Sequence, residues 1–252
     1  MNDIQAVKSS RYAHLHLLCT ALIATVVSLF VTSVGAEEKA HSLFDGKSLD
    51  GWETLSDDAY LWKVADGAIT AGSLTQKVPH NSFLATKRAY HNFDLRLKIR
   101  ISGTEGFVNS GVQIRSVRLP GSHEMVGYQV DAGKGWWGKL YDESRRRKVI
   151  GQAANLGAVN KAVKEHGWNE YRIRAEGPCI RSWINDVPAL DYTETDANIA
   201  LDGHIGLQVH GGGKTLVQVK DVTIEELPPT PNAPTWKKVG LPKAAKRKAK
   251  RK

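Results

Sequence analysis

The chain has 252 residues, two cysteines and a formal net charge of +9, which is distributed unevenly. The basic residues after position 236 contribute +9 and no acidic residue follows Glu226, whereas residues 37–236 together carry −1. This nearly neutral middle segment gives no reason to expect nucleic-acid binding there, and it is long enough for one domain whose core needs no disulfide.

The first 36 residues have the pattern of a secretory signal peptide. Lys8 and Arg11 precede an apolar run at residues 15–34, which is followed by the small residues Gly35 and Ala36. We expect cleavage after Ala36 and export of the mature protein to the periplasm or the extracellular space. The alternative is a retained membrane anchor, because the run is about long enough to span a bilayer.

The middle of the chain shows the alternation of short β-strands. Residues 93–101 have apolar side chains at every odd position and charged side chains at every even position, which predicts a strand with one buried face. Shorter alternations occur at residues 171–175 and 205–210, and turn-forming pairs such as Asp66-Gly67 and Asn185-Asp186 separate other apolar runs. No sustained helical period follows the signal segment. The pattern therefore predicts an all-β fold, an antiparallel sandwich or barrel.

Several of the expected strands place polar side chains on one face. Around residues 109–115, Val112 and Ile114 are expected to enter the core, so that Gln113 and Arg115 point the other way. Further strands repeat this pattern with Gln129 and Asp131, with Lys139, Tyr141 and Glu143, and with Gln208 and His210. Such a face suits a polyhydroxylated ligand, because sugar hydroxyls need donors and acceptors held on a rigid base.

Two tryptophans lie beside this expected face. Trp136 and Trp137 stand between Gly135 and Gly138, and we expect them to form an aromatic platform for the apolar side of a sugar ring. The alternative interpretation is a solvated outer face with two tryptophans that cap the core.

Other chemistries have no signature in this sequence. It contains no glycine-rich phosphate loop with its lysine, no Gly-x-Ser-x-Gly motif and no closely spaced cysteine and histidine cluster. We therefore predict no cofactor and no metal ion.

The end of the chain is expected to be an extended linker and a disordered basic tail. Residues 228–234 contain four prolines, a composition that favours an extended chain and offers little to bury. The basic residues that follow are expected to attract a membrane or an acidic cell-wall polymer, with a merely solubilising tail as the alternative. The predicted division is a signal peptide at 1–36, one domain at 37–227 and the tail at 228–252.

Six short motifs follow one another through the middle of the chain. They are residues 42–52 (SLFDGKSLDGW), 62–67 (WKVADG), 109–111 (NSG), 127–131 (GYQVD), 168–171 (WNEY) and 206–210 (GLQVH). Together they resemble the successive motifs of the 3-keto-disaccharide hydrolase domain family. The resemblance implies a concanavalin-like jelly roll in an exported bacterial protein, and an enzyme that cleaves glycosides whose glucose unit is oxidised at C3.

The chemistry implied by this resemblance assigns roles to the polar face. A ketone at C3 acidifies the C2 proton, so that a base can remove it, the C1 substituent can leave, and water can add afterwards. Carried to this chain, Arg115 would polarise the ketone, Asp131 or Glu143 would be the base, and His210 or Lys139 would assist the leaving group. The expected substrate-binding residues are Asn109, Gln113, Gln129, Trp136, Trp137, Tyr141 and Gln208.

One motif departs from the family pattern. Family members often have Gly-Tyr-Glu-x-Gln, whereas this chain has Gln129 and Asp131 at the two polar positions. The carboxylate is therefore displaced by about 7 Å along the same face, so either the base or the substrate is placed differently. A non-catalytic carbohydrate-binding domain and a surface adhesin acting through the basic tail are the alternative hypotheses, because one fold serves many functions.

Overall fold

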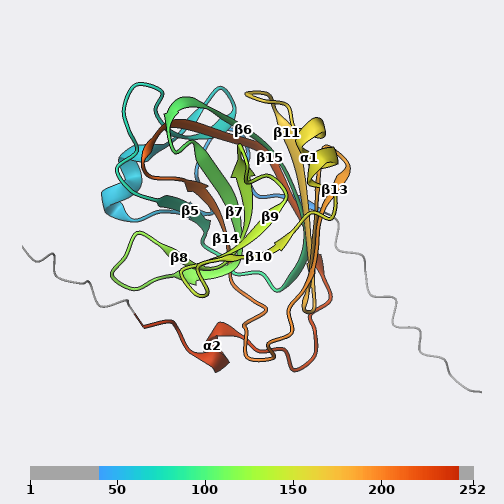
Figure 1. Ribbon diagram of the computed structural model, residues 1–252. Coiled ribbons are helices and arrows are strands. Elements are labelled where there is room, and N and C mark those ends of the chain that lie inside the picture. The colour runs from blue at the N-terminus through green and yellow to red at the C-terminus, as the bar shows by residue number, and fades with distance from the viewer. Residues whose placement is uncertain (1–39, 244–252) are drawn as a thin grey trace, which may run out of the picture. The chain divides into compact units, whose positions relative to one another are not determined.

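Residues 40–243 are described by a computed structural model, and they form two antiparallel β-sheets packed face to face (Figure 1). The predicted signal peptide and the basic residues from position 244 onward lie outside the described residues. Within residues 40–243, no helix has the length and apolar character that a membrane crossing requires.

The first sheet, here called sheet A, has eight strands in the order β13-β12-β11-β6-β15-β4-β3, with β1 paired to β15. In chain order these strands are β1 (His41–Ser42), β3 (Trp62–Ala65), β4 (Ala68–Gly72), β6 (Asn92–Gly106), β11 (Asn169–Glu176), β12 (Cys179–Ile184), β13 (Val187–Thr193) and β15 (Gly213–Leu227).

The second sheet, sheet B, has seven strands in the order β10-β9-β8-β7-β14-β5-β2. They are β2 (Trp52–Glu53), β5 (Ser82–Thr86), β7 (Asn109–Arg118), β8 (Met125–Gly133), β9 (Lys139–Glu143), β10 (Val149–Gln152) and β14 (His204–Val209). Three short helical elements complete the described chain: η1 (Ser56–Leu61), α1 (Leu156–Ala162) and α2 (Trp236–Val239).

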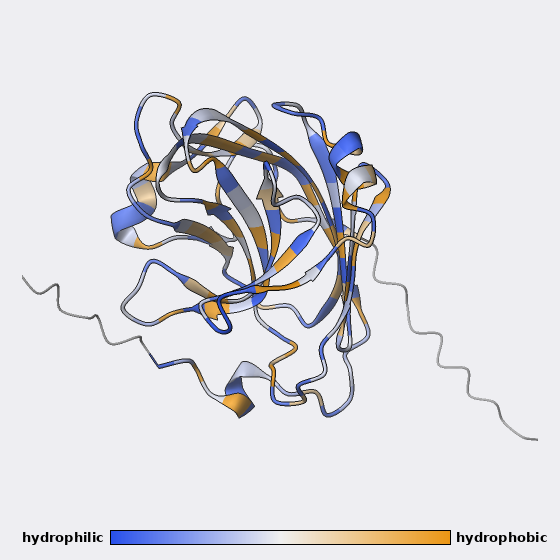
Figure 2. Cartoon of the chain, in the orientation of Figure 1, coloured by the Kyte–Doolittle hydropathy of each residue, from blue (hydrophilic) through white to orange (hydrophobic). Residues whose placement is uncertain are grey.

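The core lies between the two sheets and follows from the alternation along the strands. In β6 the odd-numbered apolar side chains from Phe93 to Ile101 are buried, and they pack in one cluster with Val112 and Ile114 of β7. Figure 2 shows hydrophobic and hydrophilic residues alternating along the strands of both sheets. Each buried aliphatic or aromatic side chain contributes roughly 1.5–3 kcal/mol, so this shared core holds the sheets together. The predicted all-β sandwich is confirmed.

Two of the predicted hairpin turns have backbone angles that suit their residues. Asp66 and Gly67 join β3 to β4 with φ of 51° and 68°, and Asn185 and Asp186 join β12 to β13 with φ of 48° and 64°. Positive φ at both central residues matches the right-handed twist of paired strands, and Asn, Asp and Gly adopt it at low cost. These turns therefore set the register of both hairpins.

The packed part of the chain extends past the predicted domain end at residue 227. The Trp236 side chain of α2 is buried against a small cluster that includes Val117 and Val126, and its indole Nε1 donates to the carbonyl of Arg115 at 3.1 Å. At the start of this segment, the Asn92 amide donates to the carbonyl of Pro228 at 2.6 Å. The expectation of an unpacked linker is wrong here, because one large apolar side chain supplies the burial that the prolines lack.

Candidate active site on the polar face of sheet B

The face of sheet B that points away from the core carries a ladder of hydrogen-bonded polar side chains. The register places Gln113 of β7 opposite Gln129 of β8, and the Gln113 amide donates to the Gln129 oxygen at 3.0 Å. The Gln129 amide in turn donates to Asp131 Oδ1 at 2.9 Å, and the hydroxyl of Ser116 donates to Gln113 Oε1 at 2.6 Å. This ladder holds Asp131 in one orientation.

Some polar atoms beside this ladder are buried without a hydrogen-bond partner among the described residues. They are Asp131 Oδ2, both amide atoms of Gln208, and Asn109 Nδ2. The register aligns Gln208 of β14 and Asp131 of β8 on either side of Gly111. Buried polar atoms are almost always hydrogen-bonded, and each one left unsatisfied costs about 1–3 kcal/mol. These atoms therefore mark where a polar ligand is expected to bind.

Gly111 is required by the way Gln129 lies across the sheet. A β-carbon at position 111 would come within 2.6 Å of Gln129 Cγ, which is closer than real side chains approach. Any other residue would push Gln129 aside and disturb its hydrogen bond to Asp131. The Asn-Ser-Gly motif thus keeps the centre of the face free of a side chain.

Two carboxylates on this face have strongly raised pKa values. Burial raises the pKa of Asp131 to about 8, and the negative charge of Glu143 adds to this effect. Burial also raises the pKa of Glu143 to about 7, with a further contribution from the charge of Glu124. Tyr141 lies two residues before Glu143 on β9 and opposite Gln129 of β8, and burial together with the charges of Glu143 and Asp131 raises its pKa. The face thus holds two carboxyl groups that change charge near neutral pH.

Aromatic side chains line one edge of the polar face. Trp136 meets Tyr141 and Phe107 edge to face, with ring centroids 6.2 and 6.1 Å apart, and Lys139 Nζ lies 5.1 Å from the Trp136 ring centroid. The Phe107 ring also meets the His210 ring edge to face, with ring centroids 4.5 Å apart. Trp136 and Phe107 are placed where one side of a sugar ring could stack on them.

His210 is held in one tautomer at this edge. Its Nδ1 is 2.6 Å from the carbonyl of Gly211, which can only accept, so Nδ1 carries the proton and Nε2 is left as an acceptor. Burial lowers the pKa of His210, which favours the neutral ring.

Arg115 does not share this face, and the expected placement is wrong. Two residues of β7, Arg115 and Ser116, stand opposite the single Gly127 of β8, because the register shifts between Ile114 and Val117. This β-bulge, with Arg115 at a φ of 51°, breaks the strand alternation and redirects the side chain.

Each of the three nitrogens of the redirected guanidinium donates a hydrogen bond inside the protein. Its Nε, Nη1 and Nη2 donate to the carbonyl of His91, the carbonyl of Gly177 and Asn92 Oδ1 at 3.0, 2.6 and 2.9 Å. Arg115 therefore links sheet B to the ends of strands in sheet A and does not meet a ligand on the polar face.

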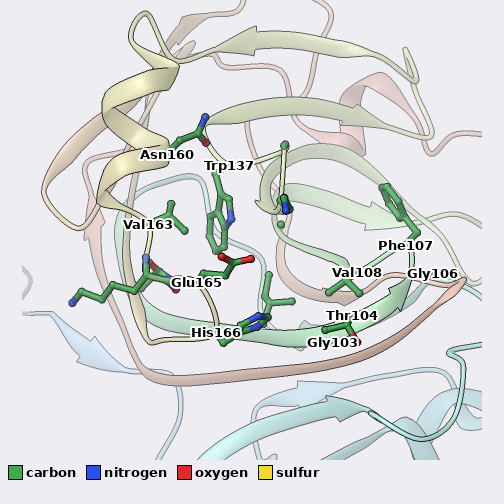
Figure 3. Close-up of a pocket in the computed structure, with 16 residues that line it drawn as sticks. Gly103, Thr104, Gly106, Phe107, Val108, Trp137, Asn160, Val163, Glu165 and His166 are labelled. Carbon is green, nitrogen blue, oxygen red and sulfur yellow. The ribbon is translucent and has the colours of Figure 1, made fainter.

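Trp137 is also separated from its neighbour. Its side chain is buried in the core beside Tyr171, with ring centroids 5.7 Å apart, so it cannot form a platform with Trp136. Trp137 instead faces a cavity of about 860 Å³ at one end of the sandwich, where α1 and the loop after it approach Gly133 at the end of β8 and Gly135 just beyond it (Figure 3). In this tight turn Trp136 and Trp137 point in opposite directions, so the expectation that both would form one platform is wrong.

Glu124 is a residue of the face that the sequence analysis missed. It lies at the end of the loop between β7 and β8, and its carboxylate accepts hydrogen bonds from the Asn81 amide at 3.1 and 3.3 Å. Because its negative charge raises the pKa of Glu143, Glu124 belongs to the same electrostatic group. No motif marked it, since loop residues reach the face only through the fold.

The sandwich and its polar face together define a jelly-roll domain of a kind used in carbohydrate chemistry. The model of the 3-keto-alpha-glucoside-1,2-lyase-like domain family matches residues 39–225, and the chain belongs to this family. The resemblance inferred from the six motifs is confirmed. Among curated protein sequences, none matches this chain.

Solved structures support the fold. A candidate glycosyl hydrolase from Parabacteroides distasonis aligns with a TM-score of 0.54 at 17% identity, covering 76% of this chain and 95% of that chain. A protein of unknown function with a galectin-like fold from Bacillus subtilis aligns with a TM-score of 0.54 at 8% identity, with coverages of 76% and 96%. The β-glucanase of Bacillus licheniformis aligns at 0.50 and 9%, with coverages of 75% and 98%.

Proposed function

We propose that this domain is an enzyme that cleaves 3-keto-glycosides by eliminating the C1 substituent and then adding water. Membership of the family connects the domain with carbohydrate chemistry. The observation that carries the proposal is the combination, on one face, of unpartnered buried polar atoms with two carboxyl groups whose pKa values lie near neutrality. The first feature suits sugar hydroxyls, and the second suits proton transfer.

Glu143 is the better candidate for the base. With a pKa of about 7 it is partly ionised at neutral pH while remaining basic enough to accept a carbon-bound proton. In the proposed step the C2–H bond breaks and the proton passes to Glu143. The electron pair from this bond forms the C2=C3 double bond of an enolate, with negative charge on the C3 oxygen. When the C3 carbonyl re-forms, this pair makes the C1=C2 double bond as the C1–O bond to the leaving group breaks.

Asp131 is the better candidate for the acid. A pKa of about 8 keeps it mostly protonated at pH 7. Because Oδ1 accepts from Gln129, the proton belongs on the unpartnered Oδ2, from which it can pass to the departing oxygen. Asp131 then takes a proton from the water whose hydroxyl adds to C1, and Glu143, after its proton has exchanged with solvent, protonates C2, so that both carboxyl groups return to their starting states. Two carboxyl groups held at different pKa values can thus divide the acid and base roles.

The positive charge that stabilises the enolate must come from a residue other than Arg115. Lys139 lies on the polar face beside Trp136, and its charge lowers the pKa of Asp131, so its field reaches this carboxyl. We assign Lys139 to the C3 oxygen of the substrate. The amides of Asn109 and Gln208 and the neutral His210 would bind hydroxyls, and Trp136 would stack on the ring.

Export and attachment complete the proposal. The signal segment is proposed to deliver the domain outside the cytoplasm, and the basic tail is proposed to bind acidic polymers or membranes there. Retention of the whole mature chain on anionic vesicles should fall as salt rises from about 0.05 to 0.5 M, because ions screen exposed charges. Salt-insensitive retention, or none, would count against an electrostatic tail.

The function is tested by incubating the domain with a 3-keto-glucoside and, separately, with its unoxidised parent. The proposal expects the aglycone to be released from the ketone alone, as followed by NMR. Binding of both sugars without release would instead indicate a carbohydrate-binding domain. Activity on the parent glycoside alone would contradict the ketone-dependent mechanism.

A further inference from the structure

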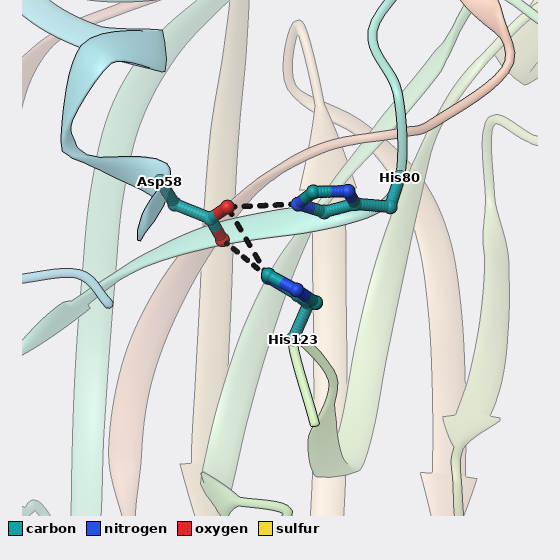
Figure 4. Close-up of side chains that lie close together, drawn as sticks. All are labelled: Asp58, His80 and His123. Carbon is teal, nitrogen blue, oxygen red and sulfur yellow. Dashed lines mark hydrogen bonds and ion pairs between the residues drawn. The ribbon is translucent and has the colours of Figure 1, made fainter. Parts of the chain in front are cut away.

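A second cluster of polar side chains lies outside the acid and base pair described above. Asp58 of η1, His80 of the segment before β5, and His123 of the loop between β7 and β8 converge on one point (Figure 4). His80 Nε2 lies 2.8 Å from Asp58 Oδ1, and His123 Nδ1 lies 3.2 Å from Asp58 Oδ2. The two imidazole rings are in contact, with centroids 3.7 Å apart and ring planes tilted by 37° to each other.

The cluster has the composition and spacing of a metal site. One ligand atom from each residue lies within 4.8 Å of the others. Imidazole and carboxylate ligands at about 2.0–2.2 Å from a Zn²⁺ ion would lie roughly 3–3.5 Å from one another, so small side-chain movements suffice. Two imidazoles with one carboxylate favour transition metals over Ca²⁺ or Mg²⁺, which prefer oxygen ligands.

The Asp58 carboxylate of the cluster is buried, and a further hydrogen bond from outside the cluster fixes its orientation. Asp58 has no exposed surface, and the hydroxyl of Ser82 hydrogen-bonds to it while accepting from Trp62 Nε1 at 2.9 Å. In metal sites, hydrogen bonds of this kind orient the side chains that coordinate the metal directly. The side chains of His80 and His123 are 36% and 34% exposed, which leaves the open side of the cluster to solvent.

The cluster also adjoins the polar face. His80 is followed by Asn81, and His123 by Glu124, and these two neighbours hydrogen-bond to each other at 3.1 Å. A metal ion at the cluster would therefore join the segment before β5 to the β7–β8 loop, beside the residue that raises the pKa of Glu143.

We propose that Asp58, His80 and His123 bind one divalent transition-metal ion, with Zn²⁺ as the expected occupant and with solvent at its remaining positions. The sequence shows no metal-binding motif here, because Asp58 is separated from the two histidines by 22 and 65 positions along the chain. Only the fold brings the three side chains together. The site is independent of the assigned acid and base, so its test does not depend on the proposed reaction.

The test is calorimetric titration of the untagged, chelator-treated mature protein with ZnCl₂, and with CaCl₂ for comparison. The proposal expects one Zn²⁺ per chain and much weaker binding of Ca²⁺. At Zn²⁺ concentrations about a hundred times the dissociation constant, the unfolding midpoint should rise by about 5–10 °C.

Variants locate the site. His80→Ala and His123→Ala should each weaken Zn²⁺ binding at least about 100-fold, since each removes a direct ligand and even outer-shell changes cost about 10–100-fold. His41→Ala, which changes an exposed histidine outside the cluster, is the matched control and should bind normally. Circular dichroism establishes that the variants fold. The two partly exposed histidines are changed instead of Asp58, because a change at this fully buried carboxylate is expected to disturb the fold itself.

The results divide cleanly. One-to-one binding that is lost in both histidine variants and kept in the control supports the site. No binding by the wild type, a stoichiometry other than one, or unchanged affinity in either histidine variant would overturn it.

Discussion

Sheet B contains two groups of buried polar side chains that differ in one respect. Around Arg115, the guanidinium nitrogens Nε, Nη1 and Nη2 each donate to an acceptor inside the protein. Around Asp131, the amide of Gln208 and one carboxylate oxygen have no partner among residues 40–243. In the sequence, both groups appear only as polar residues on alternating positions of strands. The structure separates them by their hydrogen bonds: we expect the partnered Arg115 group to stabilise the fold and the unpartnered atoms around Asp131 to bind a ligand.

The largest expected effect is the loss of activity when the base is removed. Glu143→Gln keeps the shape of the side chain and removes its basicity, so turnover of a 3-keto-glucoside should fall by about 10²–10⁴-fold. Initial rates of aglycone release measure this loss. Glu176→Gln changes an exposed carboxylate of sheet A and should leave the rate unchanged. Full activity in Glu143→Gln would remove Glu143 from the mechanism.

A large loss of stability is expected when Arg115, whose guanidinium nitrogens all have hydrogen-bond acceptors, is replaced. Arg115→Met leaves the carbonyls of His91 and Gly177 without this donor, at about 1–3 kcal/mol for each buried acceptor, while Asn92 Oδ1 keeps its hydrogen bond from the Gly177 amide. The free energy of unfolding in urea should therefore fall by about 2 kcal/mol or more.

The control for that change is an exposed arginine. Arg181→Met affects an ion pair with Asp191 in which both side chains are exposed, and it should change stability by no more than about 0.5 kcal/mol. Equal effects in the two arginine variants would mean that Arg115 has no special structural role.

Replacing Gln208, whose amide atoms have no hydrogen-bond partner among the described residues, is expected not to reduce stability. Gln208→Leu replaces a buried amide that has no partner, so stability should stay constant or rise by up to about 1 kcal/mol while substrate binding weakens. Gln218→Leu is the matched control, because Gln218 accepts two hydrogen bonds from Arg100 and its loss should destabilise the protein. Strong destabilisation by Gln208→Leu would show that this amide already serves the fold.

A separate expected effect at Asp131 is a change in the pH dependence of stability. The folded protein holds the Asp131 proton up to a pKa of about 8, far above the usual value of 3.8, so this group destabilises the fold progressively as pH rises from about 4 through 8. Asp131→Asn should reduce the fall in unfolding temperature between pH 5 and pH 9.

Asp191→Asn, at an exposed position, is the control for this pH effect and should leave the difference between the two pH values as in the wild type. An unchanged difference in Asp131→Asn would mean that Asp131 has an ordinary pKa, and the assignment of the acid would then fail.

Strand alternation predicted much of the fold and part of the site. It assigned Val112 and Ile114 to the core, and it predicted Gln113, Gln129 and Asp131 on one side of the sheet, where the structure joins them. This worked because a regular strand has a strict two-residue period, so that each inward apolar residue determines the direction of its neighbours.

The remaining features depend on interruptions that the period cannot reveal. One extra residue in β7 turned Arg115 away from the face, and a tight turn sent Trp137 into the core. Trp236 docks on side chains far from it in sequence, and the Asp58 cluster joins η1 to two loops that are distant in the sequence. Such features come from tertiary contacts, so local pattern alone was insufficient to predict them.

The most direct test of the central claim follows the C2 hydrogen during turnover in D₂O. If the domain works by elimination and hydration on the polar face, the 3-keto-glucose product will carry deuterium at C2 above the level of an enzyme-free control. Glu143→Gln will then bind the substrate without forming this labelled product. Product that keeps its original C2 proton would show direct hydrolysis of the glycosidic bond and would contradict the mechanism.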